Sequence, residues 1–482
     1  MERILIKDIV NRIGQKVVLK GWVDVRRDHG KLIFIDLRDS SGKVQVIFIM
    51  RPATGDLTKV SDVYRDRIMA DRLRPEWVIE IEGVVKERPK SMENPDLPTG
   101  KIEIEVTKLK ILNEAKTPPI DVFGKGDDIG EEARLKYRYL DLRRPRLQKN
   151  LRNRHKIINF IRGFLAEKDF TEIETPILTK STPEGARDYV VPSRLHPGKF
   201  YALPQSPQQY KQLLMVSGFE RYFQIARCFR DEDTRGDRQP EFTQLDLEMS
   251  FTDQEEILNL TEELFLNLAR ILYPAKKIRL TEEGKIPRIT YKEAMKKYGT
   301  DKPDARSDKN NPDELAFLFV VDFPMFEWKE KEKRWDAVHH PFTMPQAENV
   351  EEFWDLFKKD PASISAFQYD FVLNGYEIGG GSIRTHNSEL LMAVFEAMGN
   401  KPEAIKKQFG HLLEAFKYGV PPHGGIAPGI DRLAMILENE PNIREIIAFP
   451  KTGDGRDLMM DAPSEISKKQ LKELGIKIKD SD

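Results

Sequence analysis

The chain has 482 residues, enough for roughly three domains at about 150 residues each. Its composition is 39% hydrophobic and 33% charged, with 30 glycines and 30 prolines, which excludes wholesale disorder, a collagen-like fibre and a disulfide-stapled mini-protein. Because 78 basic residues face 79 acidic ones, the net charge is −1, and a nucleic-acid partner would have to be held by local patches.

Cysteine usage and hydropathy indicate the compartment. Cys228 is the only cysteine, so neither an intrachain disulfide nor a cysteine-based metal cluster can form. The first ten residues alternate charged and aliphatic side chains, and apolar runs such as 316–321 are far shorter than the roughly 18 residues of a membrane span. We therefore expect a cytoplasmic protein with no export signal and no membrane span.

The first 112 residues have a hydrophobic period of two, which is typical of strands. The expected strands are 16–26, 31–39, 44–49, 77–88 and 102–112. A helical stretch, 57–73, separates the third strand from the fourth. Five short strands with one interposed helix predict a small closed barrel of the oligonucleotide-binding (OB) kind over residues 1–112.

The outer face of this barrel carries an unusual set of side chains. Ile33, Ile35 and Leu37 share the inner face, so Phe34 falls on the outer face among charges. Gln45 also points outward, and the first strand ends in Arg26 and Arg27. An aromatic ring, an amide and arginines suit single-stranded RNA, but a half-exposed Phe34 that merely covers the barrel is an equal alternative.

Residues 113–145 lose periodicity, gather prolines and glycines, and read as a hinge or linker. A second domain is expected over 146–482, beginning with a helix through Leu147 and Leu165 and a strand at 170–173. Strands and helices mix without a βαβ rhythm or a Gly-x-Gly-x-x-Gly turn, which favours an antiparallel α+β fold. The polar stretch between about 253 and 334 is expected to be a peripheral insertion.

Three polar clusters in the second domain could carry chemistry. Residues 227–248 form a loop of alternating arginines and acids between strand-like runs, in which Arg230 is expected to point inward. The alternative for this loop is a solvated hairpin tip. Residues 376–384 place Glu377 and Arg384 around three glycines, an arrangement that suits a close ligand or a bulge without function. Residues 423–432 lead into a helix with Arg432 in its first turn, a misplaced charge unless an anion binds there.

Two other kinds of site are disfavoured. His339 and His340 are adjacent, and adjacent side chains point apart on a strand, so we do not expect a shared metal. No serine lies in a nucleophile-elbow context, so a Ser-His-Asp triad is not expected.

At these clusters the chain resembles the class II aminoacyl-tRNA synthetases, in particular the bacterial-type aspartyl-tRNA synthetases. The motifs that carry the resemblance are Thr175-Pro176, Phe229-Arg-Asp-Glu with Arg238-Gln-Pro-Glu-Phe, Gly429-Ile-Asp-Arg432, Ser181-Thr-Pro-Glu-Gly-Ala-Arg-Asp188, Gln205-Ser-Pro-Gln-Gln-Tyr-Lys211, His339-His-Pro-Phe-Thr343 and Ala448-Phe-Pro-Lys-Thr452. Family members usually carry an extra domain between the second and third motifs. Only a shortened insertion at about 280–320 stands here, so no role of that domain is carried over.

The resemblance implies that aspartate and ATP give aspartyl-adenylate, which is transferred to the terminal adenosine of tRNA(Asp). Arg230 and Arg432 would be the catalytic residues. The implied ATP site is Arg230, Asp231, Glu232, Gln239, Glu377, Gly429, Ile430, Asp431 and Arg432. Asp370 and Glu377 would bind Mg²⁺ as oxygen ligands. Because the substrate carboxylate is itself the nucleophile, the absence of a triad is understandable.

The resemblance also implies the aspartate pocket. Arg384 would grip the side-chain carboxylate with both arms of its fork, Lys211 would add a second positive charge, and Asp246 would orient both. The remaining implied pocket residues are Glu184, Gln208, Arg230 and His339. Asparaginyl and lysyl relatives are the nearest enzyme alternatives, and a tRNA-binding paralogue without catalysis is the alternative from another class.

In the barrel, the implied anticodon contacts are Arg27, His29, Phe34, Gln45 and Glu103. The resemblance favours stacking for Phe34, and Glu103 could accept from an exocyclic amine of cytosine. His29 lies where family members differ in accepting tRNA(Asn) as well as tRNA(Asp). Dimerisation with a second copy follows from the likeness around Thr175-Pro176.

Overall fold

A computed structural model describes residues 2–30, 32–49, 69–181 and 185–479. The chain divides into two compact units, 1–122 and 123–482. Most of the helical stretch expected at 57–73 lies outside the described residues.

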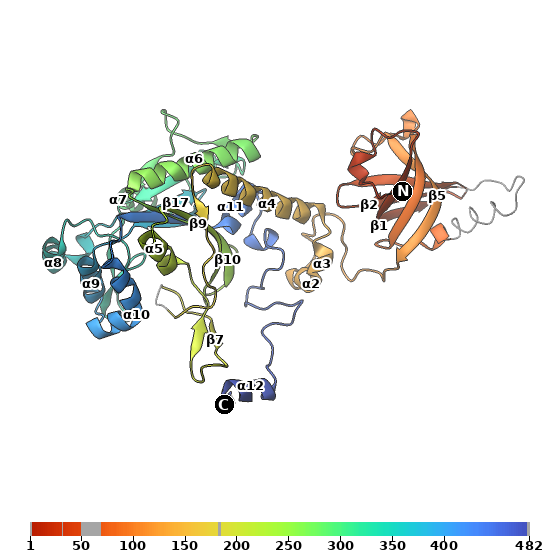
Figure 1. Ribbon diagram of the computed structural model, residues 1–482. Helices are drawn as coiled ribbons and strands as arrows, with labels where there is room; N and C mark the ends of the chain where they lie inside the picture. Colours follow the sequence, from red (N-terminus) through yellow and green to blue (C-terminus); the bar gives the residue numbers. More distant parts are fainter. Residues whose placement is uncertain (1, 31, 50–68, 182–184, 480–482) are drawn as a thin grey trace, which may run out of the picture. The chain divides into compact units, whose positions relative to one another are not determined.

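The first unit is a closed barrel with strand order β1-β2-β3-β5-β4, which confirms the predicted OB-type architecture (Figure 1). Its elements are η1 (Ile6–Asp8), β1 (Lys16–Asp28), β2 (Leu32–Arg38), β3 (Lys43–Ile49), β4 (Val78–Glu87), η2 (Lys90–Met92) and β5 (Ile102–Asn113). Alternate residues of β2 are buried, among them Ile33, Ile35 and Leu37. Phe34 lies on the outer face, as the period predicted, and is half-buried.

The second unit is built around an eight-stranded sheet of described residues, in the order β12-β14-β17-β18-β19-β10-β9-β6. Its strands are β6 (Thr171–Glu172), β9 (Arg221–Phe229), β10 (Glu241–Ser250), β12 (Arg288–Thr290), β14 (Phe317–Val321), β17 (Gln368–Leu373), β18 (Tyr376–Ile383) and β19 (His423–Pro428). The sheet is antiparallel from β14 to β9, as expected, whereas β12 and β6 join its edges in parallel.

Helices and small ribbons surround this sheet. The helices are α2 (Glu131–Lys136), α3 (Arg138–Asp141), α4 (Pro145–Ala166), α5 (Gln208–Val216), α6 (Gln254–Leu272), α7 (Tyr291–Tyr298), α8 (Val350–Lys359), η3 (Pro361–Ser363), α9 (Ser388–Ala397), α10 (Pro402–Phe416), α11 (Ile430–Leu437), η4 (Ile443–Glu445) and α12 (Lys468–Leu474). The ribbons pair β7 (Val190–Pro192) with β8 (Phe200–Ala202), β11 (Lys277–Ile278) with β13 (Glu314–Leu315), and β15 (Phe326–Lys329) with β16 (Arg334–Ala337).

The two faces of the sheet differ in chemistry. Leu245 and Leu247 of β10 join the main hydrophobic core, to which α4, α6 and α11 also contribute (Figure 1). Asp246 and Glu248 alternate with these leucines, so their side chains leave on the opposite face. A single strand therefore supplies the core on one side and buried carboxylates on the other.

The expectation that 253–334 is a peripheral insertion is wrong for most of that stretch. Helix α6 buries ten residues, and β12 and β14 are strands of the central sheet. Phe317, Leu318, Phe319 and Val320 are all buried. The charged residues around this hydrophobic run lowered the average hydropathy and hid a core strand.

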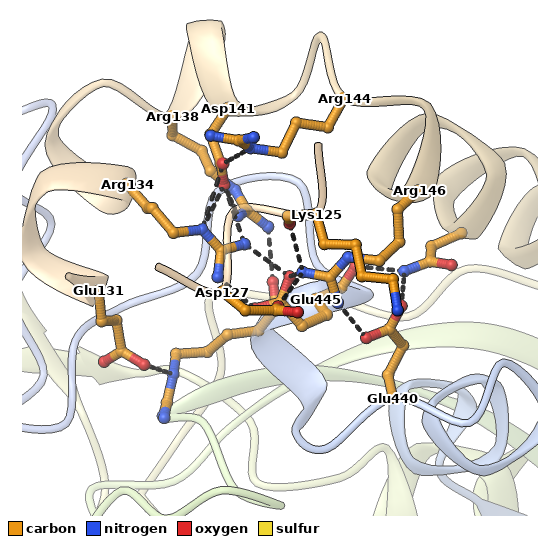
Figure 2. A network of polar contacts seen from close by, with 12 residues as sticks. Lys125, Asp127, Glu131, Arg134, Arg138, Asp141, Arg144, Arg146, Glu440 and Glu445 are labelled. Carbon is orange, nitrogen blue, oxygen red and sulfur yellow. Dashed lines mark hydrogen bonds and ion pairs between the residues drawn. The ribbon is translucent and has the colours of Figure 1, made fainter. Parts of the chain in front are cut away.

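The segment read as a hinge is ordered locally from residue 123 onward. Helices α2 and α3 stand in it, and their arginines converge on buried carboxylates, as Figure 2 shows. Asp141 is fully buried and bonds Arg134, Arg138 and Arg144. The helical pattern escaped notice because the buried side of these helices is charged.

Candidate active site

A cavity of about 340 Å³ lies between the polar face of the sheet, α5, α11 and the loop after β16. Lys211, Arg230, Arg384 and Arg432 all line it. These four cations come from four separate stretches of sequence, so the fold alone brings them together. The cavity therefore presents a strongly positive wall to a ligand.

Lys211 extends from α5 onto the carboxylates of β10. Its Nζ lies 3.0 Å from Asp246 and 3.1 Å from Glu248, and all three side chains are buried. Asp246 Oδ1 is buried and has no hydrogen-bond partner among the described residues. A buried, unpartnered acceptor beside an ammonium group is suited to hold that ammonium in place for a ligand.

Glu248 holds Arg384, and this corrects the expectation that Asp246 orients both cations. The Arg384 Nε and Nη2 atoms donate to the two Glu248 oxygens at 2.8 and 3.0 Å. Arg384 Nη1 donates to Ser382 at 2.7 Å and lies 2.9 Å from His340 Nε2. Arg384 Nη2 also donates to the Gly425 carbonyl at 3.4 Å, so a ligand would have to displace this long contact at Nη2 or the Ser382 and His340 contacts at Nη1.

Glycine makes this arrangement possible. Gly425 of β19 pairs with Glu248, and a Cβ on Gly425 would lie 2.2 Å from the Glu248 carboxylate. Any other residue at 425 would push the carboxylate away from Arg384. Glu248 was missed in the sequence, although its position two residues after Asp246 on a strand was a usable signal.

The two carboxylates have opposite pKa shifts. Burial would raise the pKa of Glu248, but Arg384 and Lys211 outweigh it and hold that pKa at about 2. Burial raises the pKa of Asp246, and together with the repulsion of Glu248 it outweighs the lowering by Lys211 and Arg384. Glu248 is therefore the fixed negative charge of the cluster.

His339 and His340 lie in the loop after β16 and both line the cavity. Their ring centroids are 4.4 Å apart, so the expectation that they point apart is wrong, because this segment is a bend and not a strand. Burial, followed by the charges of Arg384, Arg230 and Lys211, lowers the pKa of His339 to about 3. His339 is therefore a neutral imidazole among cations.

A buried relay sets the orientation of Gln208. The Pro421 carbonyl can only accept, so His423 Nδ1 donates to it at 2.8 Å, and His423 Nε2 is left as an acceptor for Gln212 at 3.1 Å. Gln212 then accepts from Gln208 Nε2 at 3.2 Å. The Gln208 amide nitrogen is used inside the protein, which turns its carbonyl oxygen toward a cationic group of a ligand.

Arg230 follows directly after β9 and stacks over Phe242, with 5.1 Å between the guanidinium and the ring centroid. Its Nε is buried, and within the part of the chain that the structure describes it has no hydrogen-bond partner. An arginine held by a ring and left with an unsatisfied donor is suited to bind an anion. The predicted inward direction of Arg230 is confirmed, since it lines the cavity.

Arg432 stands in the first turn of α11, as predicted. Its guanidinium bonds the Glu377 carbonyl at 2.7 Å and the Asp237 side chain at 3.1 Å. The adjacent residue, Asp431, was also implied to bind ATP, but its carboxylate is already bonded within the protein. Asp431 uses its carboxylate for Arg154 and the Thr243 amide, both at 2.9 Å.

Not every residue implied for ATP faces the cavity. Gly429, Asp431, Glu232, Gln239 and Glu377 line it. Ile430 packs in the hydrophobic core, because the first turn of α11 turns its side chain to the sheet. Asp231 lies instead in a shallow hollow beside Arg187, and Glu184 lies outside the described residues.

Asp370 and Glu377 lie on the neighbouring strands β17 and β18. Burial, followed by the repulsion of Glu377, raises the pKa of Asp370 well above its usual value. A Cβ on Gly380, which faces the cavity, would lie 3.2 Å from Asp370 Oδ1 and 3.0 Å from His339. Glu377 lines the cavity, whereas Asp370 does not line it and lies beside Gly380. Their carboxylate oxygens are the hard donors that Mg²⁺ prefers, and a dication would offset their repulsion.

In the barrel, the residues implied for the anticodon form one row across four strands. Arg27 of β1 donates to both Asp36 oxygens at 2.9 and 2.8 Å and to Gln45 at 3.3 Å. Gln45 Nε2 donates to Glu103 Oε2 at 2.9 Å. Phe34 pairs with Arg27 in the strand register and meets the His29 ring edge-on at 5.5 Å. Asp36, which was not singled out, completes this row.

Among the described residues, no helix is long and apolar enough to cross a membrane.

Comparisons with known proteins agree with both units. A profile described as tRNA synthetases class II (D, K and N) matches residues 130–453, and one described as an OB-fold nucleic acid binding domain matches 17–112. An aspartate–tRNA(Asp/Asn) ligase of Rubrobacter xylanophilus is 42% identical over 97% of this chain and 95% of its own. An aspartate–tRNA ligase of Staphylococcus carnosus is 41% identical over 97% of each chain.

The alignment with the Rubrobacter protein spans 595 residues, so that relative carries segments without a counterpart in these 482. Among solved structures, asparaginyl-tRNA synthetase from Pyrococcus horikoshii has a TM-score of 0.71 at 24% identity, covering 94% of this chain and 98% of its own. That likeness shows the fold. Profile, sequence identity and the cationic cavity agree, and the chain belongs to the class II tRNA synthetases, in the group of aspartate–tRNA ligases.

Proposed function

We propose that this enzyme joins L-aspartate to the 3′-hydroxyl of the terminal adenosine of tRNA(Asp) in two steps. In the first, the α-carboxylate of aspartate attacks the α-phosphorus of ATP, giving aspartyl-adenylate and pyrophosphate. In the second, the tRNA hydroxyl attacks the adenylate carbonyl and AMP leaves. The observation that carries the proposal is the single cavity lined by Lys211, Arg230, Arg384 and Arg432.

The first step needs alignment and charge neutralisation and no nucleophile from the protein. Arg230 would bridge the α-phosphate and the aspartate α-carboxylate, and its unpartnered Nε supports this role. Arg432 would bind the γ-phosphate, with Glu232, Gln239 and Gly429 beside the nucleotide. Asp431 would act indirectly, since its carboxylate ties the start of α11 to Arg154 and β10.

Selection of aspartate would rest on Lys211 and Arg384 together. The aspartate side-chain carboxylate would lie against Lys211 Nζ and Arg384 Nη1, while Asp246 and Glu248 hold the two cations. Asparagine would leave a charge-assisted bond unmade, at about 1.5 to 3 kcal/mol. Gln208 and neutral His339 would accept from the α-ammonium, and Glu184 is a further candidate for that pocket.

We also assign a divalent cation, Mg²⁺, to Asp370 and Glu377. When bound, Mg²⁺ would draw charge from the phosphates of ATP. The raised pKa of Asp370 fits the assignment, because burial and the repulsion of half-buried Glu377 outweigh the nearby charge of Lys302, and a dication would offset both. Glu377→Gln should raise the Mg²⁺ concentration needed for half-maximal activity about tenfold, which a Mg²⁺ titration would measure.

The barrel would read the anticodon. Phe34 would stack on one base, Arg27 would contact phosphate, and Gln45 would read a base edge. Glu103 would accept from an exocyclic amine of a base. His29 touches the Phe34 ring, which supports a part in choosing between tRNA(Asp) and tRNA(Asn). Several relatives are named for both tRNAs, so we propose that both are charged here.

The working form would be a homodimer in the cytoplasm. Exposed Ile177 and Leu178 follow the Thr175-Pro176 motif and offer apolar surface to a second copy. Cys228 is buried, and a chain with one cysteine can form no internal disulfide, as suits a reducing compartment.

The direct test is exchange of labelled pyrophosphate into ATP with aspartate, followed by charging of purified tRNA(Asp) and tRNA(Asn) side by side. Exchange with aspartate, and none with asparagine or lysine, is expected. No exchange would overturn the enzyme in favour of a tRNA-binding paralogue. Exchange with charging of tRNA(Asp) alone would keep the enzyme and refute the double specificity.

A further inference from the structure

Arginines between residues 134 and 146 bond a loop near the carboxyl end of the chain. That loop in turn contacts residues proposed to bind ATP. We name Arg134, Arg138, Asp141, Arg144 and Arg146 the arginine cluster, and residues 440–453 the carboxyl-side loop. Figure 2 shows side chains of the cluster converging on Asp141 and on Glu445 of this loop. The contacts lie within the second unit, and Arg134, Arg138, Asp141, Arg144 and Glu445 are buried.

Arg138 is the centre of the connection. Its Nη1 donates to Asp141 at 2.8 Å, and its other nitrogens donate to the carbonyls of Arg444, Ile447 and Ala448 at 2.6, 3.0 and 2.9 Å. These carbonyls lie at and beyond the end of the 3₁₀ turn η4, where backbone acceptors lack partners of their own. Only the planar fork of arginine can reach a carboxylate and three carbonyls at once.

Arg134 reinforces the same loop. Its Nη1 and Nη2 donate to the two Glu445 oxygens at 3.0 and 2.8 Å, while Nε donates to Asp141 at 3.2 Å. Burial would lower the pKa of Arg134, but Glu445 and Asp141 raise it above its usual value. Arg146 also bonds Glu445, at 3.1 Å. The arginine cluster therefore bonds this loop both at the Glu445 carboxylate and at its backbone carbonyls.

The other side of the carboxyl-side loop faces the cavity. The Ile443 amide donates to the Gly236 carbonyl at 2.9 Å, and Ile443 itself lines the cavity. The Lys451 amide donates to Gln239 Oε1 at 2.7 Å, and Gln239 Nε2 donates back to the Lys451 carbonyl at 3.2 Å. Both ends of the Gln239 amide are thus held by one residue of this loop.

The loop between β9 and β10 carries these contacts to the cations. Asp237 stands between Gly236 and Gln239 and binds Arg432 through its backbone at 3.1 Å and its side chain at 3.1 Å. A continuous set of contacts runs from Arg138 through 443–451 and 236–239 to Arg432. The non-covalent links are hydrogen bonds and an ion pair between described residues, and the backbone joins Ile443 to Arg444 and Gly236 to Asp237.

We propose that Arg138, supported by Arg134, is a positioning residue for the ATP side of the reaction, acting through the carboxyl-side loop on Gln239 and Arg432. The inference rests on the proposed function, because it concerns that cavity. If Arg138 only held the linker segment in place, its loss would lower stability and affect both substrates alike. A positioning role predicts that the KM for ATP rises while the KM for aspartate does not.

The test is Arg138→Lys in the full chain, assayed by pyrophosphate exchange. Lysine keeps the charge but cannot span the carbonyls, so we expect the KM for ATP to rise about tenfold while the KM for aspartate stays within about twofold. Arg221→Lys is the matched control. Arg221 also donates to a backbone carbonyl, that of Lys168 at 2.8 Å, but at the opposite end of β9 from Arg230.

A double-mutant cycle separates positioning from general destabilisation. Gln239→Ala removes the link to Lys451, so adding Arg138→Lys should raise the KM for ATP by less than it does in the wild-type background. Additive effects, equal changes in both KM values, or a fall in kcat alone would overturn the proposal. If Arg138→Lys does not fold, Glu445→Gln replaces it, with a smaller rise in the KM for ATP expected and an unchanged KM overturning the proposal. A wild-type enzyme without any exchange would instead refute the proposed function.

Discussion

Two forked ion pairs, one in each unit, have nearly the same geometry and opposite settings. Arg384 donates to Glu248 at 2.8 and 3.0 Å with side chains only 2% and 0% exposed. Arg27 donates to Asp36 at 2.9 and 2.8 Å with side chains 43% and 20% exposed. Distance alone therefore says little about what a pair does. Burial makes the first a fixed part of a cavity wall, and exposure leaves the second free to exchange partners with a ligand.

The largest expected effect comes from breaking the buried pair. Arg384→Leu removes a partner of the aspartate carboxylate and leaves Glu248 facing Lys211 alone, so exchange with aspartate should fall by about 1000-fold or more. An unpaired buried charge should also lower the free energy of unfolding by about 3–5 kcal/mol.

Binding of tRNA to Arg384→Leu should persist, since the barrel is a separate compact unit. Filter binding and a thermal melt check the two expectations together. Parallel loss of exchange and tRNA binding in a folded variant would make Arg384 a structural residue and remove the basis of the comparison.

The second prediction reverses the separation. Phe34→Ala removes a base-stacking interaction worth about 1–3 kcal/mol, so kcat/KM for charging tRNA should fall by about 10- to 100-fold. Pyrophosphate exchange without tRNA should stay within about twofold of the wild type. Tyr418→Ala, at an exposed ring of the second unit, is the control and should leave both activities unchanged. If Phe34→Ala charges tRNA as fast as the wild type, the ring only packs over the barrel and does not bind a base.

The third prediction concerns pH. The folded-state pKa of His339 is about 3, below the unfolded value of about 6.5, so the unfolded chain takes up the proton first. The stabilising contribution of neutral His339 is therefore complete above pH 6.5 and is lost as pH falls toward 3, by up to about 1.4 kcal/mol per pH unit.

Nitrogen NMR of the histidine rings should find His339 neutral between pH 8 and 5. On moving from pH 7.5 to 5.5, the melting temperature of His339→Gln should fall less than that of the wild type. A His339 ring that titrates near pH 6.5 would mean that the surrounding cations and the burial are not as described.

The smallest effect is expected at the exposed pair. Asp36→Asn should change the free energy of unfolding by less than about 1 kcal/mol, because water screens both partners. Chemical denaturation of the full chain, followed by a spectroscopic signal from the barrel alone, would measure this change in free energy. A decrease of several kcal/mol in the free energy of unfolding would show that the exposed pair contributes as much to stability as the buried pair.

The sequence predicted the parts of this molecule that depend on local periodicity. Alternation in the barrel strands placed Phe34 and Gln45 outside, and spacing located helices α4 and α11 within a few residues. The cation side chains were found through motifs. Their common cavity follows from the sheet order, which local spacing does not contain.

Contacts between distant segments were beyond such reasoning. Arg138 and Ala448 are 310 residues apart, and no periodicity links them. The strand at 317–321 was hidden by charged neighbours, and α2 and α3 by the charge of their buried side. Glu248 was the avoidable omission, because alternation with Leu247 already placed it beside Asp246.

The central claim is that one cationic cavity holds an acidic amino acid against a nucleotide. A crystal structure with an unreactive aspartyl-adenylate analogue tests it most directly. The account predicts the aspartate carboxylate within hydrogen-bonding distance of Lys211 Nζ and Arg384 Nη1, and the phosphate against Arg230. An analogue bound with its carboxylate turned to solvent, or outside this cavity, would contradict it.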